Sequence, residues 1–191
     1  MRRVVLRVCC LLAMASVAHA QATWDFGTGV VTGTPTLLPT NITGGTITAA
    51  NGTLLIATAS VSSGYSGATG GNNASVGAVA GALSTATSSY FEFTLTATAG
   101  NRLFVNSISL GTRSTASGPT ALALYSSANG FASVIGTAAI SANSSWTLVT
   151  FSGLSLFGST GGALTFRIYG SGGTSASAGN WRIDDVSVGV S

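Results

Sequence analysis

The sequence has 191 residues and a formal charge of +3, and three of its seven arginines, its only histidine and both cysteines fall within the first twenty positions. The remaining residues contain four arginines, four acidic residues and no lysine, histidine or cysteine, so their formal net charge is zero. This composition excludes nucleophilic catalysis by histidine or cysteine, zinc or haem ligation and lysine Schiff bases. It also provides no basic face for nucleic acid.

Residues 1–20 have the pattern of a bacterial Sec-type signal peptide. The basic start MRRVVLR precedes the apolar run VCCLLAMASVA, and the small residues Ala18 and Ala20 stand three and one positions before a predicted cut ahead of Gln21. The apolar run is too short for a permanent membrane helix, so no membrane span is expected in the mature chain. The pattern predicts a secreted or cell-surface protein with one domain, residues 21–191, that folds without disulfides.

Alternation of apolar and polar residues predicts strands along the rest of the chain. In chain order, the expected strands are 24–26, 54–60, 90–98, 103–110, 121–126, 132–140, 146–151, 163–169 and 181–190. The alternation is clearest in 90–98 and 163–169, whose side chains expected in the core are Phe91, Phe93, Leu95, Ala97, Leu164, Phe166 and Ile168.

Glycine, asparagine and serine clusters separate these runs, as turns require. The longest irregular stretch, 62–82, is expected to be a surface loop or an insertion. No window has apolar residues at helical spacing, and no repeat of fixed period is found. About nine strands at this spacing predict an all-β fold, a single antiparallel β-sandwich of the jelly-roll type.

Two of the expected strands change phase along their length. In 181–190 the apolar positions are odd-numbered before Asp184-Asp185 and even-numbered after it. In 103–110 the change falls at Asn106-Ser107. Because one extra residue moves the following side chains to the opposite face, the sequence predicts a β-bulge at each place.

Both ends of the domain carry a family resemblance. The ending Trp181-Arg-Ile-Asp-Asp-Val-Ser-Val188 resembles the last strand of galactose-binding-like jelly rolls, which include carbohydrate-binding modules of secreted bacterial enzymes. The segment Trp24-Asp-Phe-Gly-Thr-Gly29 resembles their first strand. The middle of the chain, including Tyr90–Ala99, Ser109–Pro119 and Tyr125–Phe131, is similar to bacterial surface proteins of the PEP-CTERM type, although no sorting tail of that type is expected.

The resemblance implies a structural calcium ion between the first and last strands. In such modules these strands lie side by side, and acids from both often bind the ion, which implies Asp25 with Asp184, Asp185 or both as ligands. Two of the four acidic residues of the mature chain are adjacent in this pair, and their charges repel unless a cation or an arginine intervenes. The alternative is that they pair with Arg182 or another arginine, or accept hydrogen bonds from turn amides.

The polar faces of the expected strands offer side chains suited to sugars. Aromatic rings pack against the C–H faces of sugars, and planar polar groups bind their hydroxyls. The candidate ligand-binding residues are Tyr90, Glu92, Arg113, Tyr125, Arg167 and Tyr169. The alternative is an ordinary solvent-facing sheet surface, where tyrosine is common. Trp146 and Trp181 are assigned to the core instead, because each shares a face with aliphatic residues.

These observations predict a secreted, non-enzymatic binding or extracellular-matrix module. Carbohydrate is the preferred ligand class, and the partner would be an extracellular polysaccharide or a surface protein. The alternative is a purely structural, self-assembling surface protein that packs through small Ser, Thr and Ala faces. Glycoside hydrolysis is not expected, because it needs two carboxylates across a cleft and only Asp25 and Glu92 stand apart from the terminal pair.

Overall fold

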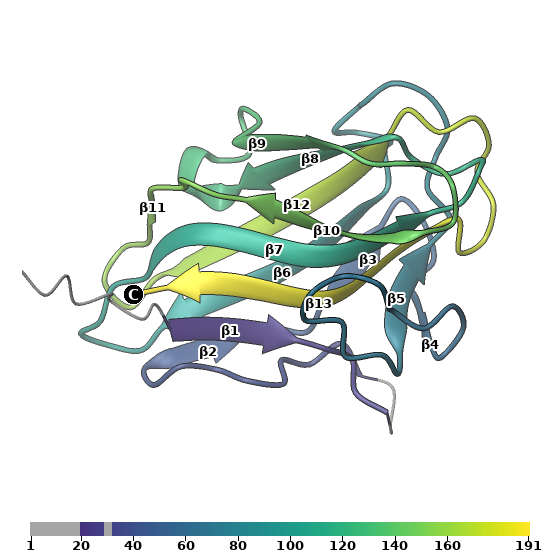
Figure 1. Ribbon diagram of the computed structural model, residues 1–191. Coiled ribbons are helices and arrows are strands. Elements are labelled where there is room, and N and C mark those ends of the chain that lie inside the picture. The colour runs from purple at the N-terminus through teal and green to yellow at the C-terminus, as the bar shows by residue number, and fades with distance from the viewer. Residues whose placement is uncertain (1–19, 29–31) are drawn as a thin grey trace, which may run out of the picture.

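The computed structural model describes residues 20–28 and 32–191, which fold into two antiparallel sheets packed face to face (Figure 1). The first sheet has seven strands: β1 (Ala20–Trp24), β4 (Leu55–Ala57), β5 (Asn73–Val76), β7 (Phe104–Ser114), β10 (Trp146–Phe151), β11 (Leu156–Phe157) and β13 (Trp181–Val190). The second has six: β2 (Ile42–Gly44), β3 (Thr48–Ala50), β6 (Tyr90–Ala97), β8 (Ala121–Ser126), β9 (Gly136–Ala139) and β12 (Ala163–Ser171). A short 3₁₀ helix, η1 (Ser127–Asn129), follows β8. The predicted all-β antiparallel sandwich is confirmed, with thirteen strands in these residues rather than about nine.

The last strand of the chain occupies the middle of the seven-stranded sheet. The strand order is β10-β7-β13-β5-β4, with β1 also beside β13 and β11 also beside β7. In the six-stranded sheet the order is β2-β6-β12-β8-β9, with β3 also beside β6. β1 and β13 pair from Ala20 with Val190 to Trp24 with Val186. The expectation that the first and last strands are neighbours is therefore confirmed.

Four short strands escaped the sequence analysis. β2, β3 and β11 have two or three residues each, which is too few for alternation to be visible. β5 lies inside the 62–82 stretch, so the prediction that this whole stretch is irregular is wrong. All four residues of β5 are buried, and its polar Asn73 and Ser75 hydrogen-bond to the backbone of the neighbouring segment at Ala59 and Leu55. Because both of its faces are covered, β5 lacks the one-sided pattern that predicts a strand.

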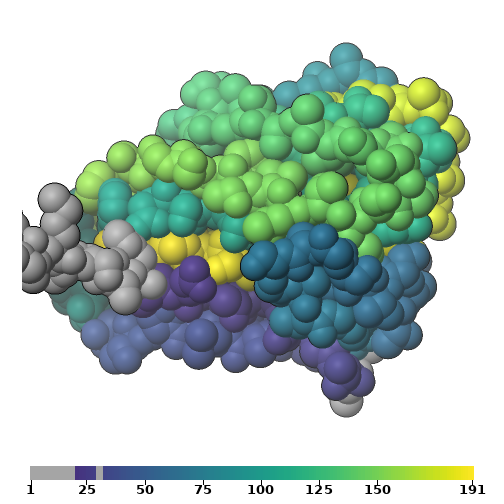
Figure 2. Space-filling model, viewed as in Figure 1, coloured from purple at the N-terminus to yellow at the C-terminus, as the bar shows by residue number. Residues whose placement is uncertain are grey.

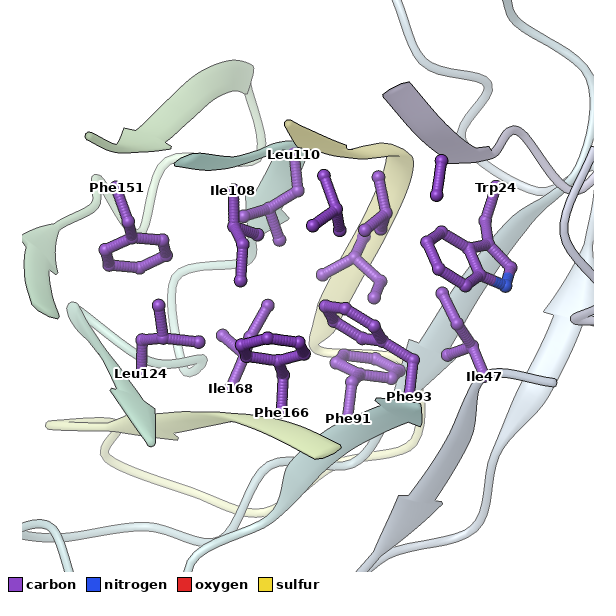
Figure 3. Close-up of a cluster of buried hydrophobic side chains, with 14 of the residues drawn as sticks. Trp24, Ile47, Phe91, Phe93, Ile108, Leu110, Leu124, Phe151, Phe166 and Ile168 are labelled. Carbon is purple, nitrogen blue, oxygen red and sulfur yellow. The ribbon is translucent and has the colours of Figure 1, made fainter. Parts of the chain in front are cut away.

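The hydrophobic core fills the space between the sheets (Figure 3). Phe91, Phe93 and Phe166 from the six-stranded sheet lie opposite Ile108 and Leu110 from the seven-stranded one. The seven side chains predicted to be buried from 90–98 and 163–169 are all at most 3% exposed, so this prediction is confirmed. The alternation of the sequence therefore identifies the inward face correctly.

Both predicted β-bulges are present where β13 pairs with β7. Asp184 pairs with Gly111 and Ser187 with Ser109, so β13 has one extra residue at this point. Asp185 there has a φ of 48°, a left-handed conformation that is uncommon for a residue other than glycine. Further along, Gly189 and Val190 pair with residues 107 and 105, so the second extra residue is in β7 at position 106.

Of the two tryptophans predicted to lie in the core, one is buried there and the other is not. Trp181 is fully buried, as expected. Trp146 is only half-buried, and its assignment to the core is wrong. In β10 the buried side chains are Val149 and Phe151, so Trp146 and Leu148 lie on the outer face, where Leu148 is 45% exposed. The aliphatic neighbour that suggested burial is itself a surface residue.

The predicted signal peptide lies outside the described residues except for Ala20, the first residue of β1. In the part of the chain that the structure describes, no helix is long and apolar enough to span a membrane.

Candidate functional site

A groove with a volume of about 310 Å³ lies on the outer face of the seven-stranded sheet. Figure 2 shows β13 in yellow as a low strip beside β1 in purple, with the segment around residues 62–70 rising at one end. The groove is lined by Gln21, Thr23, Trp24, Asp25, Tyr65, Ser66, Gly67, Thr69, Ser109, Leu148, Asp185, Val186 and Ser187.

Small polar side chains make the floor of this groove. Strand register places Thr23, Ser187, Ser109 and Thr150 side by side across β1, β13, β7 and β10. These residues point outward because their neighbours along each strand, such as Val188, point into the core. The result is a row of four hydroxyl groups across the sheet.

Gly189 of β13 leaves space on the outer surface of the sheet next to the groove. Gln21 and Ser107 flank Gly189 in the adjacent outward row. A Cβ atom at Gly189 would collide with the side chains of Asn106 and Ser107. The absence of a side chain at this position therefore leaves space for the Asn106 amide and the Ser107 hydroxyl on the sheet surface beside the groove.

One end of the groove is closed by residues 59–69, which are tied to the sheet by hydrogen bonds. The Trp146 Nε1 donates to the carbonyl of Ser60 at 2.9 Å, and the Arg182 Nη1 donates to the carbonyl of Ala59 at 3.0 Å. The Tyr65 ring lies 6.4 Å from that of Trp146, centroid to centroid. Trp146 thus positions the wall of the groove from the outer face of the sheet.

Tyr65 reaches the sheet because the strand beneath it has no side chain. A Cβ atom at Gly111 would occupy the position of the Tyr65 hydroxyl. That hydroxyl donates a hydrogen bond to the carboxylate of Asp185. Burial, together with this bond, raises the pKa of Tyr65, so its phenol stays neutral and acts as a donor.

Asp185 connects the bulge to the wall of the groove. Besides the bond from Tyr65, its carboxylate accepts hydrogen bonds from the Thr69 hydroxyl at 2.5 Å, the Thr69 amide at 3.3 Å and the Ser62 hydroxyl at 3.4 Å. The extra residue in β13 turns this side chain toward 62–69. A phase change visible in the sequence therefore marks the residue that holds the wall.

Asp184 is fully buried beside it. Its Oδ1 accepts a hydrogen bond from the Asp185 amide at 2.8 Å, whereas its Oδ2 has no hydrogen-bond partner in the part of the chain described. Burial, together with the neighbouring carboxylates of Asp185 and Asp25, raises the pKa of Asp184 to about 7, against the opposing effect of hydrogen bonds from the Ser62 hydroxyl and the Asp185 amide. About half of this carboxyl group is therefore protonated at neutral pH.

The three aspartates proposed as calcium ligands do not share one site. Asp25 and Asp185 both line the groove, whereas Asp184 is not among the described residues that do. Asp25 accepts hydrogen bonds from the Thr36 hydroxyl at 2.5 Å and the Gly27 amide at 3.1 Å. Among the described residues no three Asp, Glu, His or Cys side chains are grouped to hold a metal ion. The contacts match the turn-amide alternative better than a calcium site, with hydroxyl groups as additional donors.

The alternative in which Arg182 pairs with Asp184 or Asp185 is not what the structure shows. Arg182, the nearest arginine in sequence, donates from Nη1 to the carbonyl of Ala59 and to the Asn73 Oδ1 at 2.9 Å. It thus holds β5 and the wall of the groove rather than an aspartate. Burial and the neighbouring charge of Arg113 lower the pKa of Arg182.

We accordingly expect calcium to leave the stability of the protein unchanged. Melting curves would be recorded in excess calcium and in excess chelator, for the native chain and for Asp185→Asn. Equal melting temperatures in the two solutions are the expected result. A higher melting temperature in calcium that Asp185→Asn abolishes would instead demonstrate a cation site at the bulge.

Five of the six candidate ligand-binding residues come together on the outer face of the other sheet. Register pairs Glu92 with Arg167 and Tyr90 with Tyr169 between β6 and β12, and Tyr125 follows on β8. The Arg167 Nε donates to the Glu92 Oε2 at 2.7 Å, which raises the pKa of the guanidinium. The Tyr169 ring lies 4.7 Å from that of Tyr90 and 5.3 Å from that of Tyr125, centroid to centroid.

This cluster also contains Phe131, which the sequence analysis missed. The Phe131 ring lies 4.1 Å from the Cζ of Arg167, which places the guanidinium over an aromatic face. Tyr169 is 1% exposed and Tyr125 9%, so their rings pack against their neighbours and are not accessible to a sugar. Phe131 directly follows the Asn129-Gly130 turn, and this is the feature of the sequence from which its place in the cluster could have been predicted.

Arg113 lies apart from the other five candidates. It is on β7 in the seven-stranded sheet, between Trp146 and Arg182. Its Nε donates to the carbonyl of Ser144 at 2.8 Å. In the structure Arg113 therefore holds the turn before β10.

No protein-family model and no curated protein sequence matches the chain. Among solved structures it is similar to the K1 cleaved adhesin domain of Lys-gingipain from Porphyromonas gingivalis, with 14% identity over 88% of this chain and 97% of that one and a TM-score of 0.46. It is similar to the CBM22-1 xylan-binding domain of Xyn10C from Paenibacillus barcinonensis, with 14% identity, coverage of 92% and 97%, and a TM-score of 0.44. A CBM6 module of lichenase 5A from Cellvibrio mixtus, in complex with cellotriose, has 17% identity, coverage of 74% and 88%, and a TM-score of 0.40.

Proposed function

We propose that this chain is a secreted, non-enzymatic module that binds an extracellular polysaccharide in the groove of the seven-stranded sheet. The observation that carries the proposal is the row of outward hydroxyl groups from Thr23, Ser187 and Ser109 on the groove floor. Hydroxyl groups both donate and accept hydrogen bonds, which suits a ligand that is itself polyhydroxylated. The preferred sites of ligand binding are concave surfaces that combine such polar groups with apolar ones.

The walls of the groove add the remaining chemistry that a sugar requires. Leu148 and the Tyr65 ring provide apolar surface for C–H groups. The carboxylates of Asp25 and Asp185 line the same groove, where they hold hydroxyl groups of Thr36 and Thr69 in place. The floor between them is uncharged, so a neutral sugar enters without the desolvation penalty of an unpaired charge.

The same carboxylates support binding without hydrolysis. Glycoside cleavage needs one carboxylic acid that is protonated and faces the substrate, together with a second carboxylate across the cleft. The carboxyl group with the raised pKa here is Asp184, which is fully buried and is not among the described residues that line the groove. Asp25 and Asp185 reach the groove but serve as acceptors for hydroxyl groups of the chain itself.

Filling the groove tests the proposal. In Ser109→Tyr the new ring would lie on the floor, and we expect at least a tenfold loss of affinity for a polysaccharide that the native protein retains. Thr137→Tyr is the matched control, because Thr137 is an exposed residue of β9 on the other sheet. The measurement is affinity electrophoresis in soluble xylan, β-glucan and galactan, followed by calorimetry with the polysaccharide that retards the protein most.

The control must bind like the native chain, and all proteins must show the same far-UV spectrum. Equal retardation of native protein and Ser109→Tyr would move the site away from the groove. Absence of retardation in every polysaccharide would contradict the proposed function. If the ligand-free protein then formed assemblies that grow with concentration, the structural alternative would replace it.

A further inference from the structure

We propose that the groove is one end of a longer track that binds a neutral, linear glycan, and that Phe104 and Phe157 stack against a sugar at the far end. This inference rests on the proposed function and specifies its ligand. The observation behind it is a pair of aromatic rings on the same outer face as the groove, with centroids 4.6 Å apart. Phe157 is 59% exposed, which is unusually high for a phenylalanine that has an aromatic neighbour.

The bulge in β7 places these rings on the outer face. Leu103 and Val105 are fully buried, so Phe104 between them points outward. Phe157 of β11 pairs directly with Phe104. If β7 continued past Ser107 as a regular strand, with residue 106 paired instead of bulged, strict alternation would direct Phe104 into the core.

Strand register puts the aromatic pair in line with the groove. Going along β13 from the wall, the outward rows are Asp184 with Gly111, Ser187 with Ser109 and Gly189 with Ser107. The next row is Ser191 with Phe104, joined by two backbone hydrogen bonds of 3.0 Å. Figure 1 shows β11 and the C-terminus at the same end of β7, away from β4 and β5.

The length of this track exceeds a single sugar. Ser187 and Ser191 are four residues apart, which is about 13 Å at about 3.3 Å per residue in a strand. From Asp185, which lines the groove, to Ser191 the distance along β13 is about 20 Å. Tyr65 stands at one end and the Phe104–Phe157 pair at the other, so an extended chain of several sugars can contact both.

The charges along the track favour a neutral ligand. Asp25 and Asp185 lie at the Tyr65 end. Arg102 precedes the aromatic end, where its Nε donates to the carbonyl of Gly158 at 3.3 Å. Between these ends the outward residues of β13 and β7 are serine and glycine, with the Asn106 amide of the bulge beside Gly189, and none of them is charged. An uncharged chain whose sugars present flat C–H faces matches both this middle part and the aromatic stack.

The test is calorimetric titration with oligosaccharides of two, four and six sugars from the cello, xylo and β-1,4-galacto series. We expect the affinity in the bound series to rise at least tenfold from two to six sugars. Phe157→Ala should weaken binding of the six-sugar ligand about tenfold, and Phe157→Trp, which retains an aromatic face, should restore it. Leu55→Ala is the matched control, since Leu55 is similarly exposed on β4 at the other end of the sheet.

The outcomes separate this inference from the proposed function. Suppose that Ser109→Tyr blocks binding, but that the native chain binds oligosaccharides of two and six sugars with equal affinity, or that Phe157→Ala binds like the native chain. The proposal of a longer track is then wrong, while the groove remains the binding site. If none of the oligosaccharides or polysaccharides binds the native protein, both proposals fail. A loss of affinity in Leu55→Ala equal to that in Phe157→Ala would show an indirect effect and would also overturn the track.

Discussion

Phe166→Ala is expected to lower the free energy of unfolding by about 3–5 kcal/mol. Phe166 has no exposed surface and stacks on Phe93, with ring centroids 5.4 Å apart, at the centre of the interface between the sheets. Removing the ring takes away its transfer free energy and leaves a cavity that rigid strands on both sides cannot close. Guanidinium unfolding monitored by tryptophan fluorescence gives the value.

The same substitution at an exposed position is the control. Phe157→Ala removes an identical ring from a residue that is 59% exposed, and we expect its effect on stability to be within about 0.5 kcal/mol. A loss below about 1 kcal/mol for Phe166→Ala would mean that the ring is not in a packed core. That result would contradict the arrangement of the two sheets.

The second large effect is a loss of stability as the pH rises from about 4 to about 7. The pKa of Asp184 is about 7 in the folded protein, against an ordinary value of 3.8. Between these values the unfolded chain has released the proton and the folded chain still holds it, so rising pH favours unfolding. At 1.36 kcal/mol per pKa unit, the loss is about 4 kcal/mol, complete once the pH is well above 7.

Asp184→Asn tests this assignment. An amide keeps the shape of the carboxyl group and has no charge to desolvate, so the variant should be more stable than the native protein at pH 8 and nearly independent of pH. Residues 20–191 contain no histidine, so no other side chain of ordinary pKa in this part of the chain titrates near pH 7. Asp25→Asn is the comparison and should reduce the slope only slightly, because the Asp25 carboxylate is the weakest of the influences on the pKa of Asp184. Parallel stability profiles for the native protein and Asp184→Asn, measured by urea unfolding at several pH values, would refute the assignment.

The parts of the fold that could be predicted are those with a local pattern. β6 alternates over its whole length and β12 over residues 163–168, and the bulges in β7 and β13 appear as changes of phase. Short edge strands such as β2 and β11 contain too few residues for such a pattern. β5 has both faces covered, which removes the contrast between its two sides.

The groove could not be predicted because it depends on which strands become neighbours. Ser109 and Ser187 are unremarkable in a chain rich in serine, and only the register of β7 with β13 brings them together. Tyr65 comes from a segment without periodicity, and its position depends on Gly111 leaving space. In the aromatic cluster the opposite happened. Its tyrosines were named as candidates from the sequence, but their burial against one another depends on the pairing of β12 with both β6 and β8, which the sequence does not reveal.

The position of β13 in the sheet has a consequence for biosynthesis. β13 is the last strand of the chain to be made, yet β1, β5 and β7 all require it as a partner. While the ribosome is still making residues 120–170, the first strand has no edge to pair with and the seven-stranded sheet has no centre. Folding must therefore await the C-terminal segment, and pairing of the two ends closes a loop of more than 150 residues, which makes folding slow.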